Sequence, residues 1–123
     1  MNILFLCTAN INRSKSAEVL CGHLDDSNIY RSAGLSAKYT AANNSVLCTE
    51  KLLSWADHVY VFEQMHLDRI KQYTQDKYLS KISNLDIEDR YKYFDPELVQ
   101  LLKLKIPEYP NNRLIIAKTR CGT

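Results

Sequence analysis

The first 24 residues constrain the fold more than any other part of the sequence. Residues 2–6 form an apolar run typical of a buried β-strand, and residues 14–24 have the periodicity of an amphipathic helix. The apolar face of that helix is predicted to consist of Ala17, Leu20, Cys21 and Leu24. Only a short turn separates the two segments. A strand that runs into a helix through so short a turn is typical of an α/β protein.

The remainder of the chain continues this alternation. Further strands are predicted over residues 28–32, 58–62 and 81–86, and further helices over about 45–56, 64–73 and 95–104. The polar stretch 36–44 and the tail from about residue 111 fit no element. The last helix has Asp95 as N-cap, Pro96 in its first turn, and an apolar face of Phe94, Leu98, Leu101 and Leu102. Strands separated by helices pair in parallel, so we expect helices on both faces of one sheet.

Composition excludes several classes of protein. The 123 residues, 46% of them apolar, suit one globular domain over residues 1–123. The net charge of +2 is spread over both signs, so no nucleic-acid partner is indicated. No apolar run is long enough to span a membrane, and the N-terminal run is too short for a secretory signal. We therefore expect a cytoplasmic protein with no membrane partner.

The cysteines do not suggest a metal site. In the cytoplasm all four should be reduced thiols, their spacing contains no C-x-x-C pair, and no histidine stands at a ligand-like spacing from any of them. We therefore predict no metal and no cofactor. Cys21 and Cys48 are expected on apolar helix faces, in the core.

The turn after the first strand carries the chemistry. In an open parallel sheet, ligands bind at the carboxyl ends of the strands, and a helix N-terminus there attracts anions. Cys7 and Arg13 lie on either side of this turn. The positive surroundings favour a nucleophilic thiolate at Cys7, and a planar guanidinium can hold two phosphate oxygens. Ser14 could donate to the sulfur and cap the helix. Attack of sulfur on phosphorus, through a covalent cysteinyl phosphate, is the predicted reaction.

The turn also resembles the phosphate-binding loop of low-molecular-weight protein tyrosine phosphatases, C-x-G-N-x-C-R-S-P-x-A-E. The segment "CTANINRSKSAE" matches it at Cys7, Asn10, Arg13, Ser14, Ala17 and Glu18. The segments "RSAGL", "ADHVYVFEQMH" and "DIEDRY" resemble later motifs of that family, in the same order. The resemblance extends to about residue 105.

This resemblance implies a three-layer α/β/α sandwich with a four-stranded parallel sheet in the order 2-1-3-4. It implies that Cys7 is the nucleophile, Arg13 the phosphate clamp and Asp89 the general acid and base. The phosphate or substrate would be bound by Thr8, Ala9, Asn10, Ile11, Asn12, Ser14 and Tyr91, with Ser32 supporting the loop through Asn10. Tyr93 is a further aromatic candidate. The partner would be a phosphotyrosine protein or an aryl phosphate.

The sequence departs from the family pattern around the site. Asn12 replaces a second loop cysteine, so the loop has no neighbouring thiol that could trap an oxidised Cys7. Ala9 replaces a glycine, which requires that its φ is not strongly positive. Lys15 replaces a proline. The acid loop has Glu88 and Arg90 in place of two prolines, and such a loop is less rigid.

Alternatives remain for the function and for single residues. A non-catalytic phosphate or phosphopeptide-binding module would fit an impaired acid loop. Arsenate reductase would need a cysteine after the third strand, and the sequence has none there. A phosphoserine phosphatase is suggested by the asparagine before the arginine. Asp86, Glu88 and Asp95 compete with Asp89 for the role of acid, and Tyr91 could simply pack in the core.

Overall fold

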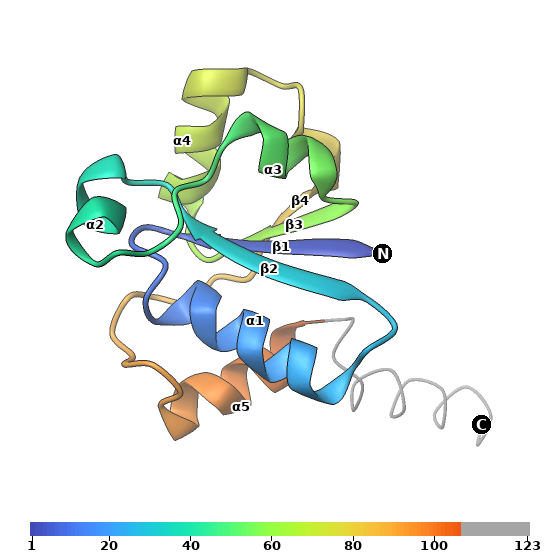
Figure 1. Ribbon diagram of the computed structural model, residues 1–123, viewed down its shortest axis with the longest axis vertical. Helices are drawn as coiled ribbons and strands as arrows, with labels where there is room; N and C mark the ends of the chain where they lie inside the picture. Colours follow the sequence, from blue (N-terminus) through green and yellow to red (C-terminus); the bar gives the residue numbers. More distant parts are fainter. Residues whose placement is uncertain (107–123) are drawn as a thin grey trace.

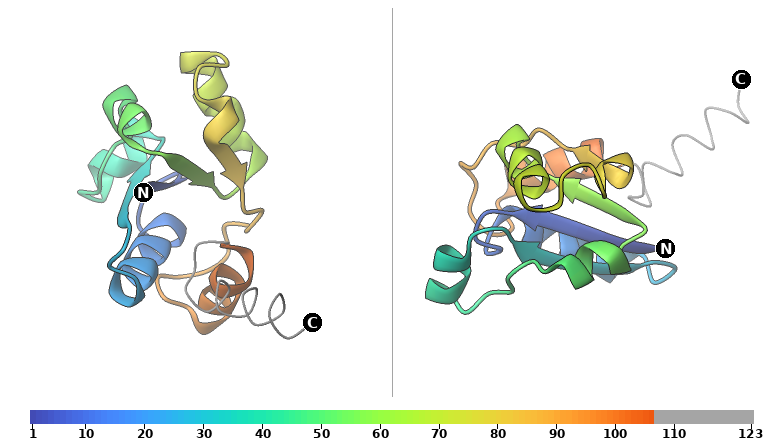
Figure 2. Two further views of the ribbon diagram at one scale, coloured as in Figure 1. Left: turned by 90° about the vertical axis from the view of Figure 1, so that its right-hand side faces the viewer. Right: turned by 90° about the horizontal axis from the view of Figure 1, so that it is seen from above.

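The structure is a computed structural model, and the residues that it describes are 1–106. An all-parallel sheet forms its centre, and helices cover both faces (Figures 1 and 2). In chain order the elements are β1 (Asn2–Cys7), α1 (Arg13–Leu24), β2 (Ile29–Gly34), α2 (Ala37–Ala42), α3 (Glu50–Trp55), β3 (His58–Val61), α4 (Gln64–Thr74), a 3-10 turn (Leu79–Lys81), β4 (Ile82–Asn84) and α5 (Pro96–Lys105).

The sheet has the strand order β2-β1-β3-β4, as predicted. All three neighbouring pairs are parallel. Helices α1 and α5 cover one face, whereas α3 and α4 cover the other (Figure 1). Short α2 lies beyond the carboxyl end of the sheet, near the turn that follows β1. This arrangement confirms the predicted three-layer α/β/α sandwich.

Strand β1 is apolar from Ile3 onward because both of its faces are covered. Ile3 and Phe5 belong to the core under α1 and α5, whereas Leu4 and Leu6 belong to the core under α3 and α4. All four side chains have no exposed surface. A strand buried on both sides has no polar face, which explains the continuous apolar run in the sequence.

The predicted apolar faces are largely confirmed. In α1, Ala17, Leu20 and Cys21 are buried, but Leu24 is 49% exposed because the helix ends there. In α5, the Asp95 carboxylate accepts a hydrogen bond from the amide of Glu97, as the side chain of an N-cap residue does. On the same helix Leu98 and Leu102 are fully buried, and Phe94 and Leu101 pack against this core.

The predicted helix over residues 45–56 is too long. Residues 45–49 are not helical: Gly34 donates to the carbonyl of Val46 and accepts from the amide of Cys48, which holds this segment beside the end of β2. Helix α3 begins after Thr49, which caps it through the amide of Leu52. Cys48 therefore lies in a non-helical segment and is only partly buried, unlike the prediction.

Helix α2 was missed because it has no apolar stripe. It has only six residues, and Thr40 is its one buried side chain. The predicted fourth strand over 81–86 is observed only over Ile82–Asn84, because Lys81 belongs to a 3-10 turn and Asp86 has a positive φ of 56°. The tail from about residue 111, with Cys121, lies outside the described residues. Within residues 1–106, no helix is long and apolar enough to cross a membrane.

Candidate active site

Cys7 lies at the base of a cavity at the carboxyl end of the sheet. It is the last residue of β1, it is 4% exposed, and it lines a cavity of about 300 Å³. The other lining residues are Thr8, Ala9, Ile11, Asn12, Arg13, Tyr39, Met65 and Asp89. Cys7 thus lies at the boundary between this cavity and the core under α1 and α5.

The backbone of the loop that follows Cys7 is available to an anion. Within the described residues, the amides of Ala9 to Asn12 donate no hydrogen bond to a protein acceptor. Asn12 is the N-cap of α1 and its side chain makes no capping bond, so the predicted cap at Ser14 is wrong. Free amides at the N-terminus of a twelve-residue helix attract negatively charged groups.

Asn10 holds the loop in shape from inside. Its φ of 56° is in the left-handed region, which asparagine tolerates better than most residues, whereas Ala9 does not have a positive φ. The Asn10 amide donates to the hydroxyls of Ser14 (2.9 Å) and Ser32 (2.8 Å). Ser32 in turn donates to the Glu18 carboxylate at 2.9 Å. The predicted contact between Asn10 and Ser32 is therefore present.

This chain of hydrogen bonds sets the direction of the Ser14 hydroxyl. Ser14 Oγ lies 2.9 Å from Cys7 Sγ. Because Ser14 Oγ already accepts from Asn10, its own hydrogen is free to point at the sulfur. A hydroxyl that donates to sulfur stabilises the thiolate, the form that acts as a nucleophile.

Arg13 is buried and fixed at one end. Its side chain is 2% exposed and lies 5.8 Å from the ring centre of Phe62. Nη1 donates to Glu63 Oε2 and to the carbonyl of Ile87, each at 2.9 Å. Nη2 lies 3.8 Å from Asp89 Oδ2. With Nη1 held by the protein, the other guanidinium nitrogens can face an anion in the cavity.

Asp89 also lines the cavity, close to Arg13. It belongs to the loop after β4, which is anchored by the amides of Leu85 and Ile87 to the carbonyls of Val61 and Phe62. Its side chain is 60% exposed. The competing Asp86 and Glu88 do not line this cavity, and Asp95 caps α5.

His66 is a part of the site that the sequence analysis missed. It lies in the first turn of α4, is 2% exposed, and its Nδ1 accepts from the amides of Phe62 and Glu63. The ring proton is therefore on Nε2, which donates to Thr8 Oγ1 at 3.1 Å. Burial, together with the Arg13 guanidinium, lowers the pKa of His66 to about 4. A neutral His66 leaves the Thr8 hydroxyl hydrogen free to point into the cavity.

Gly34 allows the loop to pack against the end of β2. A Cβ atom at this position would lie 2.7 Å from the carbonyl oxygen of Thr8 and 2.6 Å from a Thr40 methyl. Such distances are shorter than van der Waals contact. The glycine of the "RSAGL" segment is therefore required by the closeness of the Cys7 loop, and not by its φ.

Some predicted residues lie elsewhere. Tyr91 is 8% exposed in the core under α1 and α5, so it does not form a wall of the cavity. Tyr93 lines a separate hollow beside Asn10 and Ile11. The exposed side chains of Tyr39 and Met65 stand at the cavity instead. Asn10 and Ser14 are buried beneath the loop and act from behind it.

The missed residues had a signal in the sequence. Glu63 and His66 follow β3, and the carboxyl ends of neighbouring parallel strands lie at the same edge of the sheet. The rule that located Cys7 after β1 therefore also applies after β3. Tyr39 had no such signal, because it lies in α2, a helix without an apolar stripe.

Comparison with known proteins gives a consistent result at the level of structure. No protein-family model and no curated protein matches the chain. The tyrosine phosphatase Wzb from Escherichia coli K30, solved in complex with phosphate, is similar with 26% identity and a TM-score of 0.66, over 85% of this chain and 91% of that chain.

Two further solved structures are similar. The low molecular weight protein tyrosine phosphatase SP-PTP from Streptococcus pyogenes has 18% identity and a TM-score of 0.69, over 85% of this chain and 87% of its own. The YwlE arginine phosphatase from Geobacillus stearothermophilus has 18% identity and a TM-score of 0.65, over 97% of this chain and 96% of its own. With its strand order and with its cysteine loop after β1, the chain has the same α/β fold as these low molecular weight phosphatases.

Proposed function

We propose that the protein hydrolyses phosphate monoesters of aromatic alcohols, above all phosphotyrosine in proteins, through a cysteinyl phosphate intermediate. One observation carries this proposal. Cys7, whose Sγ lies 2.9 Å from Ser14 Oγ, lines a cavity together with Ala9, Ile11, Asn12 and Arg13, and within residues 1–106 the amides of Ala9, Ile11 and Asn12 have no protein acceptor. These groups match a nucleophile and the three non-bridging oxygens of a phosphoryl group.

In the first step, Cys7 Sγ attacks phosphorus, so that a bond from sulfur to phosphorus forms and the bond from phosphorus to the phenolic oxygen breaks. Arg13 and the loop amides stabilise the charge on the phosphoryl oxygens. Asp89, which also lines the cavity, donates its proton to the departing oxygen. The products are a cysteinyl phosphate and a phenol.

In the second step, water attacks phosphorus and the bond to sulfur breaks. Asp89, now a carboxylate, accepts the proton of the water, so the same group serves as acid and then as base. Ser14 stabilises the sulfur anion as it leaves. Inorganic phosphate is released, and the site returns to its starting state.

The shape of the cavity supports an aryl substrate. Cys7 lies at its base, and Ile11, Tyr39 and Met65 are exposed apolar side chains on its wall. An aromatic ring gains from contact with such groups, whereas the short side chain of phosphoserine would not reach past them. The side chain of Ile11 also offers no hydrogen-bond acceptor to the guanidinium of a phosphoarginine. YwlE, by contrast, is described as an arginine phosphatase.

Two alternatives fit the site less well. Arsenate reduction would need a second thiol at the cavity, and neither Cys21 nor Cys48 lines it. A module that only binds phosphate would not need an acid, yet Asp89 stands at the cavity wall.

The test is the hydrolysis of p-nitrophenyl phosphate and of matched phosphotyrosine, phosphoserine and phosphoarginine peptides. We expect vanadate-sensitive turnover with phosphotyrosine preferred, no turnover by Cys7→Ser, and a loss of about 100-fold or more in kcat for Asp89→Asn. Cys21→Ser, far from the cavity, is the control for thiol replacement. Tight phosphate binding without any turnover by the unaltered protein would favour the binding module instead.

A further inference from the structure

We propose that a groove leading from the Cys7 cavity along α4 binds the peptide chain of the substrate. In this groove, an acidic residue of the substrate peptide lies beside Arg69, and an apolar residue of the peptide occupies a pocket beyond Arg69. This inference rests on the proposed function, because it treats the Cys7 cavity as the place of the phosphotyrosine. It adds a class of substrate: peptides with an acidic and an apolar residue on the same side of the phosphotyrosine.

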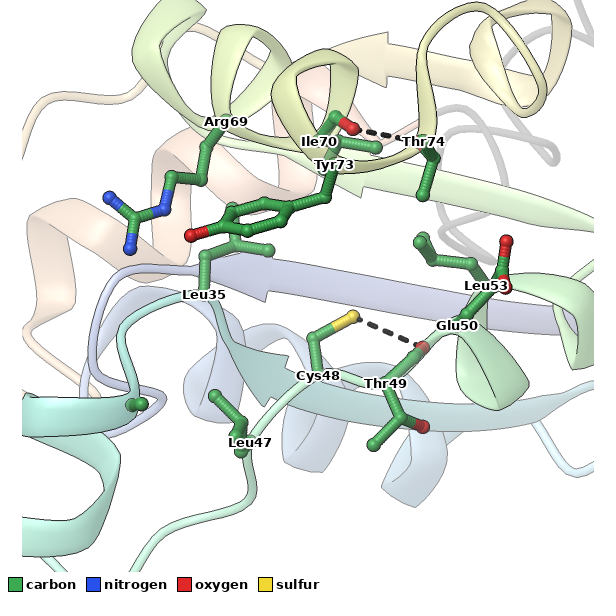
Figure 3. A pocket seen from close by; sticks show the side chains of 11 residues that line it. Leu35, Leu47, Cys48, Thr49, Glu50, Leu53, Arg69, Ile70, Tyr73 and Thr74 are labelled. Carbon is green, nitrogen blue, oxygen red and sulfur yellow. Dashed lines mark hydrogen bonds between the residues drawn. The ribbon is translucent and has the colours of Figure 1, made fainter.

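The apolar end of the groove is a pocket that the proposed chemistry does not use. It lies between α4, α3 and the segment of residues 47–49, and its volume of about 340 Å³ exceeds that of the Cys7 cavity (Figure 3). Leu35, Leu47, Leu53, Ile70 and Tyr73 give it apolar walls. Burial raises the pKa of the Cys48 thiol to about 12, so this side chain is neutral and adds to the apolar lining.

A smaller hollow connects this pocket with the Cys7 cavity. It has a volume of about 180 Å³. Thr8 and Met65 line both this hollow and the Cys7 cavity. Leu35 and Arg69 line both this hollow and the apolar pocket. These shared lining residues place the three spaces next to one another, in a row that begins at the Cys7 cavity, and this row is the groove.

One face of α4 forms a side of this groove. Met65, Arg69 and Tyr73 are four residues apart, so they lie in a row on the helix surface, and all three are exposed. The row is about 12 Å long, since each helical residue rises about 1.5 Å. An extended peptide covers that length with three or four residues. The groove therefore accommodates a short peptide segment beside the phosphotyrosine.

Arg69 supplies the charge that this groove can recognise. Its guanidinium lies 5.6 Å from the ring centre of Tyr73, and within residues 1–106 it forms no ion pair. Figure 3 shows Arg69 extending from α4 beside the Tyr73 ring. The acidic Glu50 at the far end of the pocket is paired with Lys77 at 3.2 Å. A peptide carboxylate is thus the matching partner of the Arg69 guanidinium.

The apolar side chains of the row favour a peptide occupant as well. Met65 is 53% exposed and Tyr73 is 72% exposed, and Leu47 across the pocket is 42% exposed. Exposed apolar groups that line a groove, with a cation among them, are typical of a binding surface. Because the groove starts at the site for the phosphoryl group, the substrate's own chain is the occupant that reaches all of it.

The test compares phosphotyrosine peptides that differ only beside the phosphotyrosine. One set carries Asp two residues and Leu four residues away, on the N-terminal or the C-terminal side, and the reference peptide carries alanine at these positions. We expect kcat/KM to be about 10-fold higher for one of the two flanked peptides, which also gives the direction of the chain. The value for p-nitrophenyl phosphate serves as the reference for each variant.

Charge reversal then identifies Arg69. For Arg69→Glu, the preference for Asp over alanine is expected to be lost, and a peptide with Lys in that place to become the better substrate. Tyr73→Ala should remove the preference for Leu alone. The matched control is Arg31→Glu, because Arg31 is also exposed and lies 4.8 Å from an aromatic ring, that of Trp55, but is not part of the groove. This variant should keep both preferences.

Binding measurements separate this inference from the proposed function. Peptides with a non-hydrolysable phosphonate in place of the phosphate are titrated by calorimetry, so that no turnover is needed. Flanked phosphonates that bind more tightly, without turnover of any aryl phosphate, would support the groove and contradict the enzyme. Turnover of p-nitrophenyl phosphate with equal values for flanked and alanine peptides would overturn the groove alone. Self-association that Tyr73→Ala abolishes would overturn it too, and assign the surface to a second copy of the chain.

Discussion

The two loops that meet at the cavity are held in different ways. The loop after β1 is fixed by buried hydrogen bonds through Asn10, Ser14 and Ser32, and its side chains reach into the core. The loop after β4 is held at its start by Leu85 and Ile87 and near its end by the Phe94 amide, which donates to Ser16 Oγ at 3.0 Å, but Asp89 between these points is 60% exposed. The nucleophile and the phosphate clamp are thus preorganised, whereas the acid is attached to a more open segment. Arg13 joins the two loops through the carbonyl of Ile87.

The largest expected effect comes from the link between the loops. Arg13→Lys keeps the positive charge but cannot hold Glu63, Ile87 and a phosphate together. We expect kcat/KM for p-nitrophenyl phosphate to fall by about 1,000-fold. The measurement is steady-state kinetics, with Arg31→Lys as the control for a change of the same type outside the site. If Arg13→Lys kept an activity within a few-fold of that of the unaltered protein, the Arg13 guanidinium would not be the group that binds the phosphate.

The second prediction concerns His66 on the preorganised side. Its pKa is lowered to about 4 in the folded protein, whereas a histidine in the unfolded chain has a pKa near 6.5. Between these values the unfolded chain binds a proton that the folded protein does not. The contribution of His66 to stability is therefore present above about pH 6.5 and is lost as the pH falls toward 4, by up to about 3 kcal/mol.

Urea denaturation at several pH values between 7 and 4 tests this prediction. The unaltered protein and the exposed-site variant His23→Gln should lose stability with the same slope as the pH falls. For His66→Gln the slope should be smaller, since this variant has no group to protonate at that position. Equal slopes in all three proteins would mean that His66 is not held neutral.

The third prediction tests the support behind the loop. Asn10→Ala removes the hydrogen bonds to Ser14 and Ser32 and places alanine at a φ of 56°. We expect a loss of about 2 kcal/mol in the free energy of unfolding, together with a clear fall in kcat. Asn10→Gly separates the causes, because glycine tolerates this φ but makes no side-chain hydrogen bond. If Asn10→Gly restores both stability and kcat, the network is not what orders the loop.

The smallest effect is expected on the open loop. Arg90 is exposed and paired with Glu88 at 3.2 Å and with Glu97 at 3.6 Å, on the protein surface. For Arg90→Ala we expect a change in stability below about 0.5 kcal/mol and little change in kcat, because exposed ion pairs contribute little. Thermal unfolding and p-nitrophenyl phosphate kinetics measure both. A loss as large as that of Asn10→Ala would show that the two loops are held equally firmly.

Features that depend on neighbouring residues could be predicted from the sequence, whereas contacts between distant residues could not. Strand β1 and helix α1 were predicted well because their patterns are local: an apolar run, a short turn, and apolar residues at helical spacing. The hydrogen bond from Asn10 to Ser32 was anticipated only through the family resemblance. Contacts such as Arg13 to Glu63 join residues that are 50 positions apart, and no local pattern encodes them.

The errors have physical reasons as well. Cys48 stands at helical spacing from Leu52 and Trp55, which favoured a helix from residue 45, but the hydrogen bonds to Gly34 hold residues 46–48 beside β2. Tyr91 follows the acid loop and carries a hydroxyl, yet the ring is buried in the core next to α5. For such residues, tertiary packing decides between surface and interior, and a sequence pattern of a few residues does not.

The bare α-carbon of Gly34 has a consequence for engineering. Replacing glycine with alanine usually stabilises a protein, since it narrows the freedom of the unfolded chain. Here a single methyl group would push against Thr8 and displace the strand from its neighbouring turn. A side chain at this position would therefore disturb both the stability of the fold and the geometry of the Cys7 loop. Glycine should be kept here when more stable variants are designed.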